Sequence, residues 1–206
     1  MKLTQDNNPT FGEPTIFNGI LYRSKAEARW AYFFDELDIP FEYEKRFFNL
    51  GHGRCYLPDF WLPKQKIWVE IKNSDIVSDE EEQKANGLFE VDKKDVYVFN
   101  RFPVVATFVS PFENDNTYLE EISGFSVHLS NSNLKCDRYN MENCTFTLAA
   151  ALNLWPKNVE LTSDEYRKLS SKFCSAALKA RDFIYHHPGQ FLADLMRLNG
   201  IAVEQN

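Results

Sequence analysis

Three side chains that could hold a divalent cation and act on water occur within residues 59–72. The segment IWVEIK, residues 67–72, has the apolar, β-branched composition of a strand and contains Glu70 and Lys72. Because side chains alternate between the two faces of a strand, Glu70 and Lys72 share one face. Asp59 precedes this segment across a short turn. Carboxylates that bind a metal ion beside an amine are suited to activating water for hydrolysis.

The length of the turn determines whether Asp59 reaches Glu70. If Pro63–Lys66 forms a four-residue loop, Leu62 pairs with Ile67 and Asp59 lies opposite Glu70. Directly opposed residues have Cβ atoms about 4.5–5.5 Å apart, so two carboxylates placed there repel each other unless a cation lies between them. Hard oxygen donors predict Mg²⁺ or Mn²⁺ rather than zinc. A slip of one residue would break this pairing.

The alternative is a surface hairpin in which Asp59, Glu70 and Lys72 are merely solvated, since Glu-x-Lys is a common tripeptide. Both strands, however, carry large apolar side chains on each face, namely Phe60, Trp61, Trp68 and Val69. This composition favours a partly buried sheet, in which charged groups need partners.

A helix predicted from Ser24 to about Leu37 brings a third carboxylate. Its apolar residues recur at helical spacing, at Trp30, Phe33, Phe34 and Leu37. Glu27 falls on the same core-facing stripe and could reach the sheet. Alternatively, Ser24 and Glu27 form a capping box, in which the Glu27 side chain bonds back to the amide of Ser24. The spacing leaves both interpretations open.

The order of elements predicts an α/β sandwich, because a helix, three strands, a helix and a strand follow one another. The three strands are expected at residues 41–47, 56–62 and 67–71, the second helix at 78–89 and the next strand at 95–99. Further strands are expected at 104–109 and 125–129, a long helix at 162–187 and a short one at 190–200, whereas 130–143 is loop-like and 145–154 is ambiguous. We divide the chain into an N-terminal arm (1–18), a core (19–110) and a C-terminal extension ending in helices (111–206).

Composition sets limits on the class of protein. The 206 residues are 44% hydrophobic and 15% aromatic, which is typical of a globular protein. No stretch approaches the roughly 18 apolar residues of a membrane span, and the first residues lack a signal peptide's apolar region, so a cytoplasmic location is expected. The net charge of −7 argues against nucleic-acid binding, which depends largely on Lys and Arg. A local basic surface is nevertheless sufficient for contact, and a carboxylate metal site itself contributes negative charge.

The four cysteines, at 55, 136, 144 and 174, are irregularly spaced and predict idle or buried thiols. A zinc site from Cys136, Cys144 and His128, as in a zinc-stabilised nucleic-acid binder, is a less favoured alternative because zinc ligands usually occur as closely spaced pairs.

Residues 22–72, YRSKAEARWAYFFDELDIPFEYEKRFFNLGHGRCYLPDFWLPKQKIWVEIK, resemble the core of PD-(D/E)XK nucleases of phages and mobile elements. Four features occur in the order typical of that family: a helix with a single Glu, a Tyr-Glu strand, a YLPDFW strand and a strand ending in Glu-x-Lys. The resemblance covers about a quarter of the chain. It implies a restriction-endonuclease-like core, a mixed central sheet flanked by helices, here with a smaller and mainly helical C-terminal part.

The resemblance also implies a function, a metal-dependent nuclease that hydrolyses phosphodiester bonds, of DNA rather than RNA. Carried over residue by residue, Glu27, Asp59 and Glu70 surround Mg²⁺ or Mn²⁺, together with the carbonyl of Ile71, and Lys72 assists the attacking water. Basic residues near this core are candidates for phosphate contacts, with ordinary solvated charges as the alternative: Arg23, Lys25, Arg29, Lys45 and Arg46. The competing hypothesis is a catalytically inactive nuclease-fold protein that binds a protein partner, such as a host defence or replication factor.

Overall fold

The centre of the protein is a mixed five-stranded sheet with strand order β11-β8-β7-β6-β3. The structure is a computed structural model that describes residues 12–74, 77–109, 117–130, 145–154, 161–190 and 192, without the side chains of 108–109, 128–130 and 145–147. The strands of the sheet are β3 (Glu42–Tyr43), β6 (Phe60–Leu62), β7 (Ile67–Lys72), β8 (Val96–Asn100) and β11 (Ser126–Ser130). Only β7 and β8 run parallel, and the other neighbours are antiparallel.

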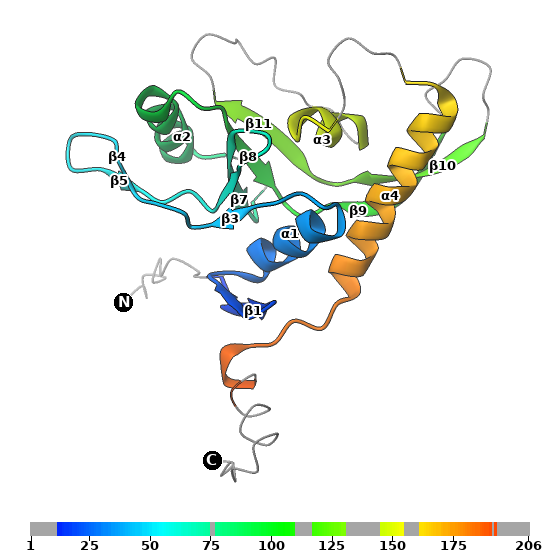
Figure 1. Ribbon diagram of the computed structural model, residues 1–206, viewed down its shortest axis with the longest axis horizontal. Helices are drawn as coiled ribbons and strands as arrows, with labels where there is room; N and C mark the ends of the chain where they lie inside the picture. The colour runs from blue at the N-terminus through cyan, green and yellow to red at the C-terminus, as the bar shows by residue number, and fades with distance from the viewer. Residues whose placement is uncertain are drawn as a thin grey trace, which may run out of the picture.

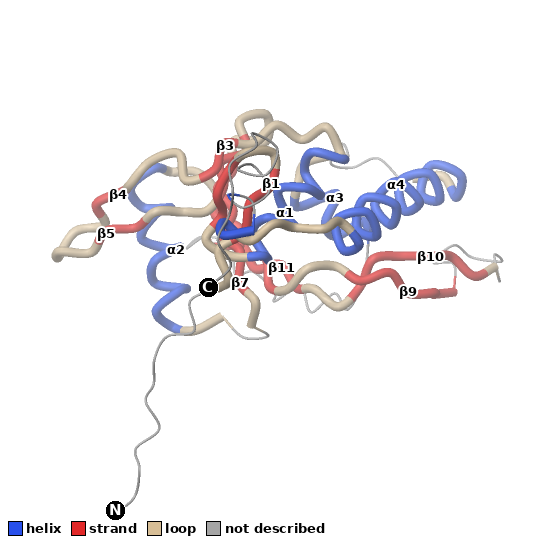
Figure 2. Tube along the Cα trace, turned by 90° about the horizontal axis from the view of Figure 1, so that it is seen from below, coloured by secondary structure: helices blue, strands red, loops and turns tan. Residues whose placement is uncertain are grey.

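Helices cover both faces of this sheet (Figures 1 and 2). One face carries α1 (Lys25–Glu36) and α3 (Thr145–Ala151), whereas α2 (Asp79–Asp92) covers the other. Helix α4 (Ser163–Asp182) packs on α1 and α3. The alternation of side chains along β7 explains this layering. Val69 packs in the hydrophobic cluster between the sheet and α1, and Trp68 packs in the cluster between the sheet and α2. A strand with apolar side chains on both faces must be buried on both faces. The predicted α/β class is therefore confirmed.

Helix α1 agrees with its sequence prediction. Ser24 is its N-cap and accepts a hydrogen bond from the amide of Glu27. Its apolar residues Trp30, Phe33 and Phe34 are buried against the sheet. The helix ends at Glu36, and Asp38 then adopts a positive φ of 57°.

Helix α4 is shorter than predicted, ending at Asp182 rather than near His187. Phe183 has an extended backbone, with a φ of −64° and a ψ of 139°. Its ring packs against Phe17 at 5.6 Å and against Tyr185 at 5.1 Å. The helix therefore ends where the ring of Phe183 packs against Phe17 near the N-terminus.

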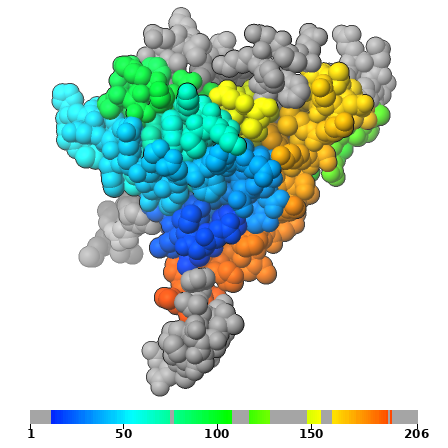
Figure 3. Space-filling view, viewed as in Figure 1, coloured from blue at the N-terminus to red at the C-terminus, as the bar shows by residue number. Residues whose placement is uncertain are grey.

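The described residues also form three two-stranded sheets. They are β1 (Thr15–Phe17) with β2 (Ile20–Tyr22), β4 (Phe48–Asn49) with β5 (Cys55–Tyr56), and β9 (Val104–Val109) with β10 (Tyr118–Ser123). The strand predicted at 41–47 is interrupted at Glu44, which has a positive φ of 45°, so β3 and β4 belong to different sheets. The strand predicted at 56–62 is likewise divided between β5 and β6. The β4–β5 hairpin protrudes at the left edge of the molecule, beside α2 (Figures 1 and 3).

The structure also bears on regions with weak sequence patterns. β1 lies within the predicted arm, and β11, which follows residue 110, is an edge strand of the central sheet, so a division at residue 110 would cut that sheet. The ambiguous segment 145–154 contains α3. The loop predicted at 130–143 and the helix predicted at 190–200 lie almost wholly outside the described residues. None of the helices in the described ranges has both the length and the apolar content that a membrane span requires.

Candidate functional site

The β6–β7 hairpin has the register that the sequence predicts. Leu62 pairs with Ile67 and Phe60 with Val69, and the turn between them contains four residues. The amide of Lys66 donates to the carbonyl of Leu62 at 2.8 Å and closes the turn. Asp59, one residue before β6, therefore comes next in register, beside Glu70.

Asp59 is tied to β7 by its side chain. Its carboxylate accepts a hydrogen bond from the amide of Ile71 at 2.7 Å, and the group is only 2% exposed. Arg23 Nη2 lies 2.5 Å from Asp59 Oδ1, while Arg23 Nε contacts Glu44 at 2.6 Å. Burial raises the pKa of Asp59 well above its usual range, and the charges of Glu70 and Glu27 raise it further. The Ile71 amide and Arg23 oppose this rise without cancelling it.

Glu70 and Lys72 are paired on the same face of β7. Lys72 Nζ lies 2.8 Å from Glu70 Oε1 and 3.3 Å from Oε1 of Glu81 at the start of α2. The hydroxyl of Tyr56 donates to the second Glu70 oxygen at 2.8 Å. Burial lowers the pKa of Lys72, but the charges of Glu70, Asp59 and Glu81 outweigh it, so that the pKa is raised overall. Lys72 is therefore a protonated ammonium group at neutral pH.

Glu27 reaches the sheet rather than closing the capping box. The Ser24 hydroxyl donates to its Oε1 at 2.8 Å, and the Tyr43 hydroxyl donates to its Oε2 at 2.5 Å. Oε2 also accepts from the amide of Arg23 at 3.2 Å, and no bond from the Ser24 amide to Glu27 is present among these contacts. Glu27 is 7% exposed, and its charge acts on Asp59. Three buried carboxylates, those of Glu27 on α1 and of Asp59 and Glu70 on the hairpin, therefore form an acidic cluster in which the charges of Glu70 and Glu27 act on Asp59.

Several residues that contact this cluster were not identified from the sequence. Tyr43 and Tyr56 donate to the acids, Glu81 pairs with Lys72, and Arg23, which was predicted only as a phosphate contact, pairs with Asp59. The two tyrosines carried a signal, because each lies within the Tyr-Glu and YLPDFW segments that characterise this region. Asn100 also lies here, in register with Lys72 on β8 and 1% exposed. Neither polar atom of its side chain has a hydrogen-bond partner within the described part of the chain.

The other basic candidates do not form one surface. Lys45 pairs with Glu42 at 2.9 Å, and Arg46 pairs with Asp92 at 2.5 Å while its guanidinium covers the ring of Phe48. Lys25 and Arg29 line a separate cavity of about 340 Å³. Of the five, only Arg23 contacts the acidic cluster.

A cavity of about 550 Å³ opens beside Glu70 and Lys72. Its lining includes basic groups from Arg23, Lys72 and Lys84 and acidic groups from Glu44, Glu70 and Glu81. Phe47 supplies an aromatic wall. The lining therefore combines charges of both signs with aromatic surface.

The donor set fits a hard divalent cation, because Asp59, Glu70 and Glu27 supply carboxylate oxygens. The side chains are nevertheless arranged as ion pairs and hydrogen bonds: Arg23 binds Asp59, Lys72 binds Glu70, and Tyr43 binds Glu27. No group of three His, Cys, Asp or Glu side chains arranged to hold a metal is found in the described ranges. Binding of a cation would therefore require Arg23 to release Asp59. Cys136, Cys144 and the side chain of His128, the alternative zinc ligands, lie outside the described residues.

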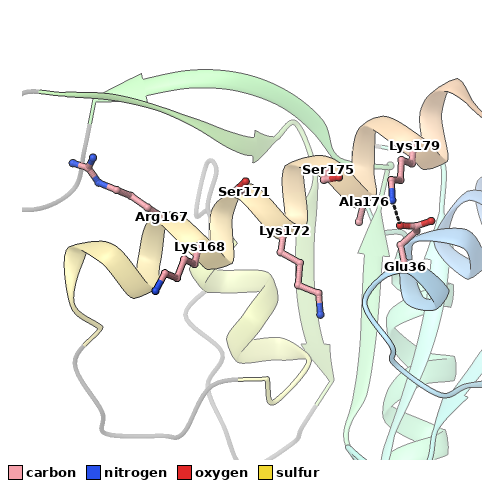
Figure 4. A pocket seen from close by; sticks show the side chains of 8 residues that line it. All are labelled: Glu36, Arg167, Lys168, Ser171, Lys172, Ser175, Ala176 and Lys179. Carbon is pink, nitrogen blue, oxygen red and sulfur yellow. Dashed lines mark hydrogen bonds and ion pairs between the residues drawn. The ribbon is translucent and has the colours of Figure 1, made fainter.

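A second cavity, of about 520 Å³, lies along α4 (Figure 4). Lys168 and Lys172 project from the same side of the helix, and Lys179 pairs with Glu36 of α1 at 2.6 Å. Lys172 lies 3.9 Å from Asp38, and both side chains are largely exposed. These are solvated surface charges, in contrast to the buried acids of the hairpin site.

Comparisons of this chain with models of protein families, with curated proteins and with solved structures give no match.

Proposed function

We propose that this protein is a metal-dependent nuclease with a restriction-endonuclease-like core of the PD-(D/E)XK type. Its substrate would be a phosphodiester bond, in DNA rather than RNA. The observation that supports this proposal is the register of the β6–β7 hairpin, which brings Asp59 beside Glu70 and Lys72, two residues that line a cavity. Asp59 and Glu70 are buried although their charges repel, and such arrangements concentrate at functional sites.

Asp59 and Glu70 would hold Mg²⁺ or Mn²⁺, with Glu27 and the Ile71 carbonyl as further ligands. The bound cation supplies a lowered pKa for a coordinated water and neutralises charge that develops on phosphorus. The protonated Lys72, 26% exposed and bordering the cavity, would donate a hydrogen bond to the attacking water or to a phosphate oxygen. Arg23, whose side chain is 56% exposed, would be free to contact phosphate after it releases Asp59.

The test is incubation of the protein with linear, circular and single-stranded DNA and with RNA, in Mg²⁺, in Mn²⁺ and in EDTA. Cleavage that requires the cation and is lost in Lys72→Ala is the expected result. Lys64→Ala is the matched control, since Lys64 is an exposed lysine in the turn of the same hairpin. Full activity of Lys72→Ala would remove the proposed role of this lysine.

The competing hypothesis, an inactive nuclease-fold protein that binds a partner protein, makes a different prediction for the metal. A nuclease should bind Mn²⁺ through Asp59, which calorimetry of the native protein and of Asp59→Ala would measure. No cleavage of any substrate, combined with no binding of Mn²⁺, would favour the inactive protein.

A further inference from the structure

Phe47 is a large apolar side chain held in solvent beside the acidic cluster. It is 73% exposed, although the next residue, Phe48, is buried and packs edge-on against Trp68 at 5.1 Å between ring centres. On the other side, Arg46 is bound to Asp92 at 2.5 Å. The backbone around Phe47 is thus anchored at both neighbouring residues, and its ring projects away from the core.

The position of this ring relates it to the proposed chemistry. Phe47 lines the same cavity of about 550 Å³ as Glu70 and Lys72. Cavities of about 300–1,000 Å³ accommodate small organic ligands, so this volume is sufficient for a nucleotide. A nucleotide that placed its phosphate near Lys72 would have its base as the part available to the aromatic wall.

We propose that Phe47 stacks on an unpaired nucleobase next to the phosphodiester bond that is cleaved. This inference rests on the proposed nuclease function and specifies its substrate class, which is single-stranded or locally unpaired nucleic acid. In a duplex both faces of each base are covered by neighbouring bases, so a protein ring reaches a base only where the stack is open or a nucleotide is extruded. Every base has a π-face, so the contact selects for unpaired structure and not for sequence.

The size of the effect follows from base–aromatic stacking, which contributes roughly 5- to 150-fold per base in binding. Phe47→Ala is expected to weaken binding and cleavage of single-stranded DNA by a factor in that range. Phe47→Trp, which retains an aromatic face, is expected to preserve both. Because Phe47 is exposed, neither substitution removes a core contact.

The experiment uses a single-stranded oligonucleotide that contains 2-aminopurine, whose fluorescence is quenched on stacking, and the same sequence as a matched duplex. Binding is measured with Ca²⁺ and cleavage with Mg²⁺, for the native protein, Phe47→Ala and Phe47→Trp. Tyr118→Ala is the matched control, because Tyr118 is 72% exposed and lies on β10, outside this cavity. With the single strand, we expect quenching and tight binding for the native protein, Phe47→Trp and Tyr118→Ala, and loss of both in Phe47→Ala. With the duplex, we expect no effect of Phe47→Ala.

Equal behaviour of Phe47→Ala and Tyr118→Ala, or a native protein that binds the duplex as well as the single strand, would overturn the stacking role. Quenching that depends on Phe47 without cleavage of any substrate would instead overturn the nuclease and support the stacking contact as a binding site. The two proposals therefore fail separately.

Discussion

Asp59 and Glu121 are both buried carboxylates, but their neighbours in the protein interior differ. Asp59 is 2% exposed and Glu121 is 5% exposed, and burial raises the pKa of both. Glu121 lies beneath α4 and is held by the hydroxyl of Tyr166, a contact that lowers its pKa and partly offsets burial. Asp59 instead lies beside two further acids, Glu70 and Glu27, which raise its pKa further.

The two carboxylates therefore differ in how the cost of their burial is offset. One hydrogen bond from a phenol is enough for a single buried carboxylate to be tolerated. Asp59 instead lies near two further carboxylates, whose charges disfavour its ionisation, and Arg23 offsets this only in part. The comparison therefore supports the proposed site at Asp59 and gives no comparable ground for one at Glu121.

The largest expected effect concerns activity. Asp59→Asn removes a carboxylate that would bind the cation, so Mg²⁺-dependent cleavage should fall by about 10²- to 10³-fold or more. Glu121→Gln should change the cleavage rate less than twofold. Initial rates on DNA test both variants, with circular dichroism to confirm the fold. Comparable losses in the two variants would contradict the distinction drawn between these carboxylates.

The second prediction concerns the ion pair of Arg23. Because its guanidinium occupies Asp59 Oδ1, Arg23 competes with a divalent cation for that oxygen. Arg23→Gln should therefore tighten Mn²⁺ binding by about tenfold, or ~1.4 kcal/mol. Calorimetric titration measures the affinity, and Lys45→Gln, which alters an exposed pair with Glu42, is the control. Weaker binding in Arg23→Gln would show that this arginine supports the site and does not compete for it.

The third prediction concerns stability in the absence of divalent cations. A carboxyl whose pKa is raised by folding holds its proton more tightly in the folded state, so its contribution is complete below the unfolded pKa and is lost as the pH rises through the folded pKa. The free energy of unfolding should thus fall as the pH rises above about 4, by at most ~1.4 kcal/mol per pH unit for each group. Asp59→Asn and Glu121→Gln should each flatten this dependence, with the larger change in Asp59→Asn. Urea denaturation at a series of pH values measures it, and slopes that stay unchanged in both variants would refute the assignment.

The smallest effect is expected on the exposed side of α4. Lys172→Ala removes a lysine that is 53% exposed and lies 3.9 Å from Asp38. Exposed pairs of this kind contribute little, so the free energy of unfolding should change by less than ~0.5 kcal/mol. Thermal denaturation would detect this as a shift of at most about 2 °C. A larger loss would mean that the basic side of α4 supports the fold.

The parts of the site that the sequence predicts are those governed by local rules. A four-residue turn and the alternation of side chains are sufficient to place Asp59 beside Glu70, and both are local properties. The hydrogen bonds from Tyr43 to Glu27 and from Arg23 to Asp59 join residues far apart in the sequence. They depend on how α1 packs on the sheet, so local patterns could not predict them. The direction in which Glu27 points could not be predicted for the same reason.

Two of the errors in the fold prediction had different causes. The β1–β2 hairpin contains the turn Asn18-Gly19, with φ values of 47° and 76°, and Asn-Gly is a strong hairpin signal that an assignment of residues 1–18 to an arm overlooked. Strand β10 was not predicted, because two consecutive acids in its sequence YLEEIS obscure the alternation of apolar and polar residues. Its hydrogen-bonded pairing with β9 makes it a strand. In the second case tertiary contacts decide the structure.

The turn at Pro63–Lys66 also limits how this chain can change over time. Adding or deleting one residue there would rotate every side chain of β6 to the opposite face relative to β7, so that Asp59 would no longer meet Glu70. The tip of the β4–β5 hairpin, with Gly51 and Gly53 at positive φ and open space around them, carries no such constraint. Insertions and reporter tags should therefore be tolerated at that tip, whereas natural selection should remove variants that change the length of the turn between β6 and β7.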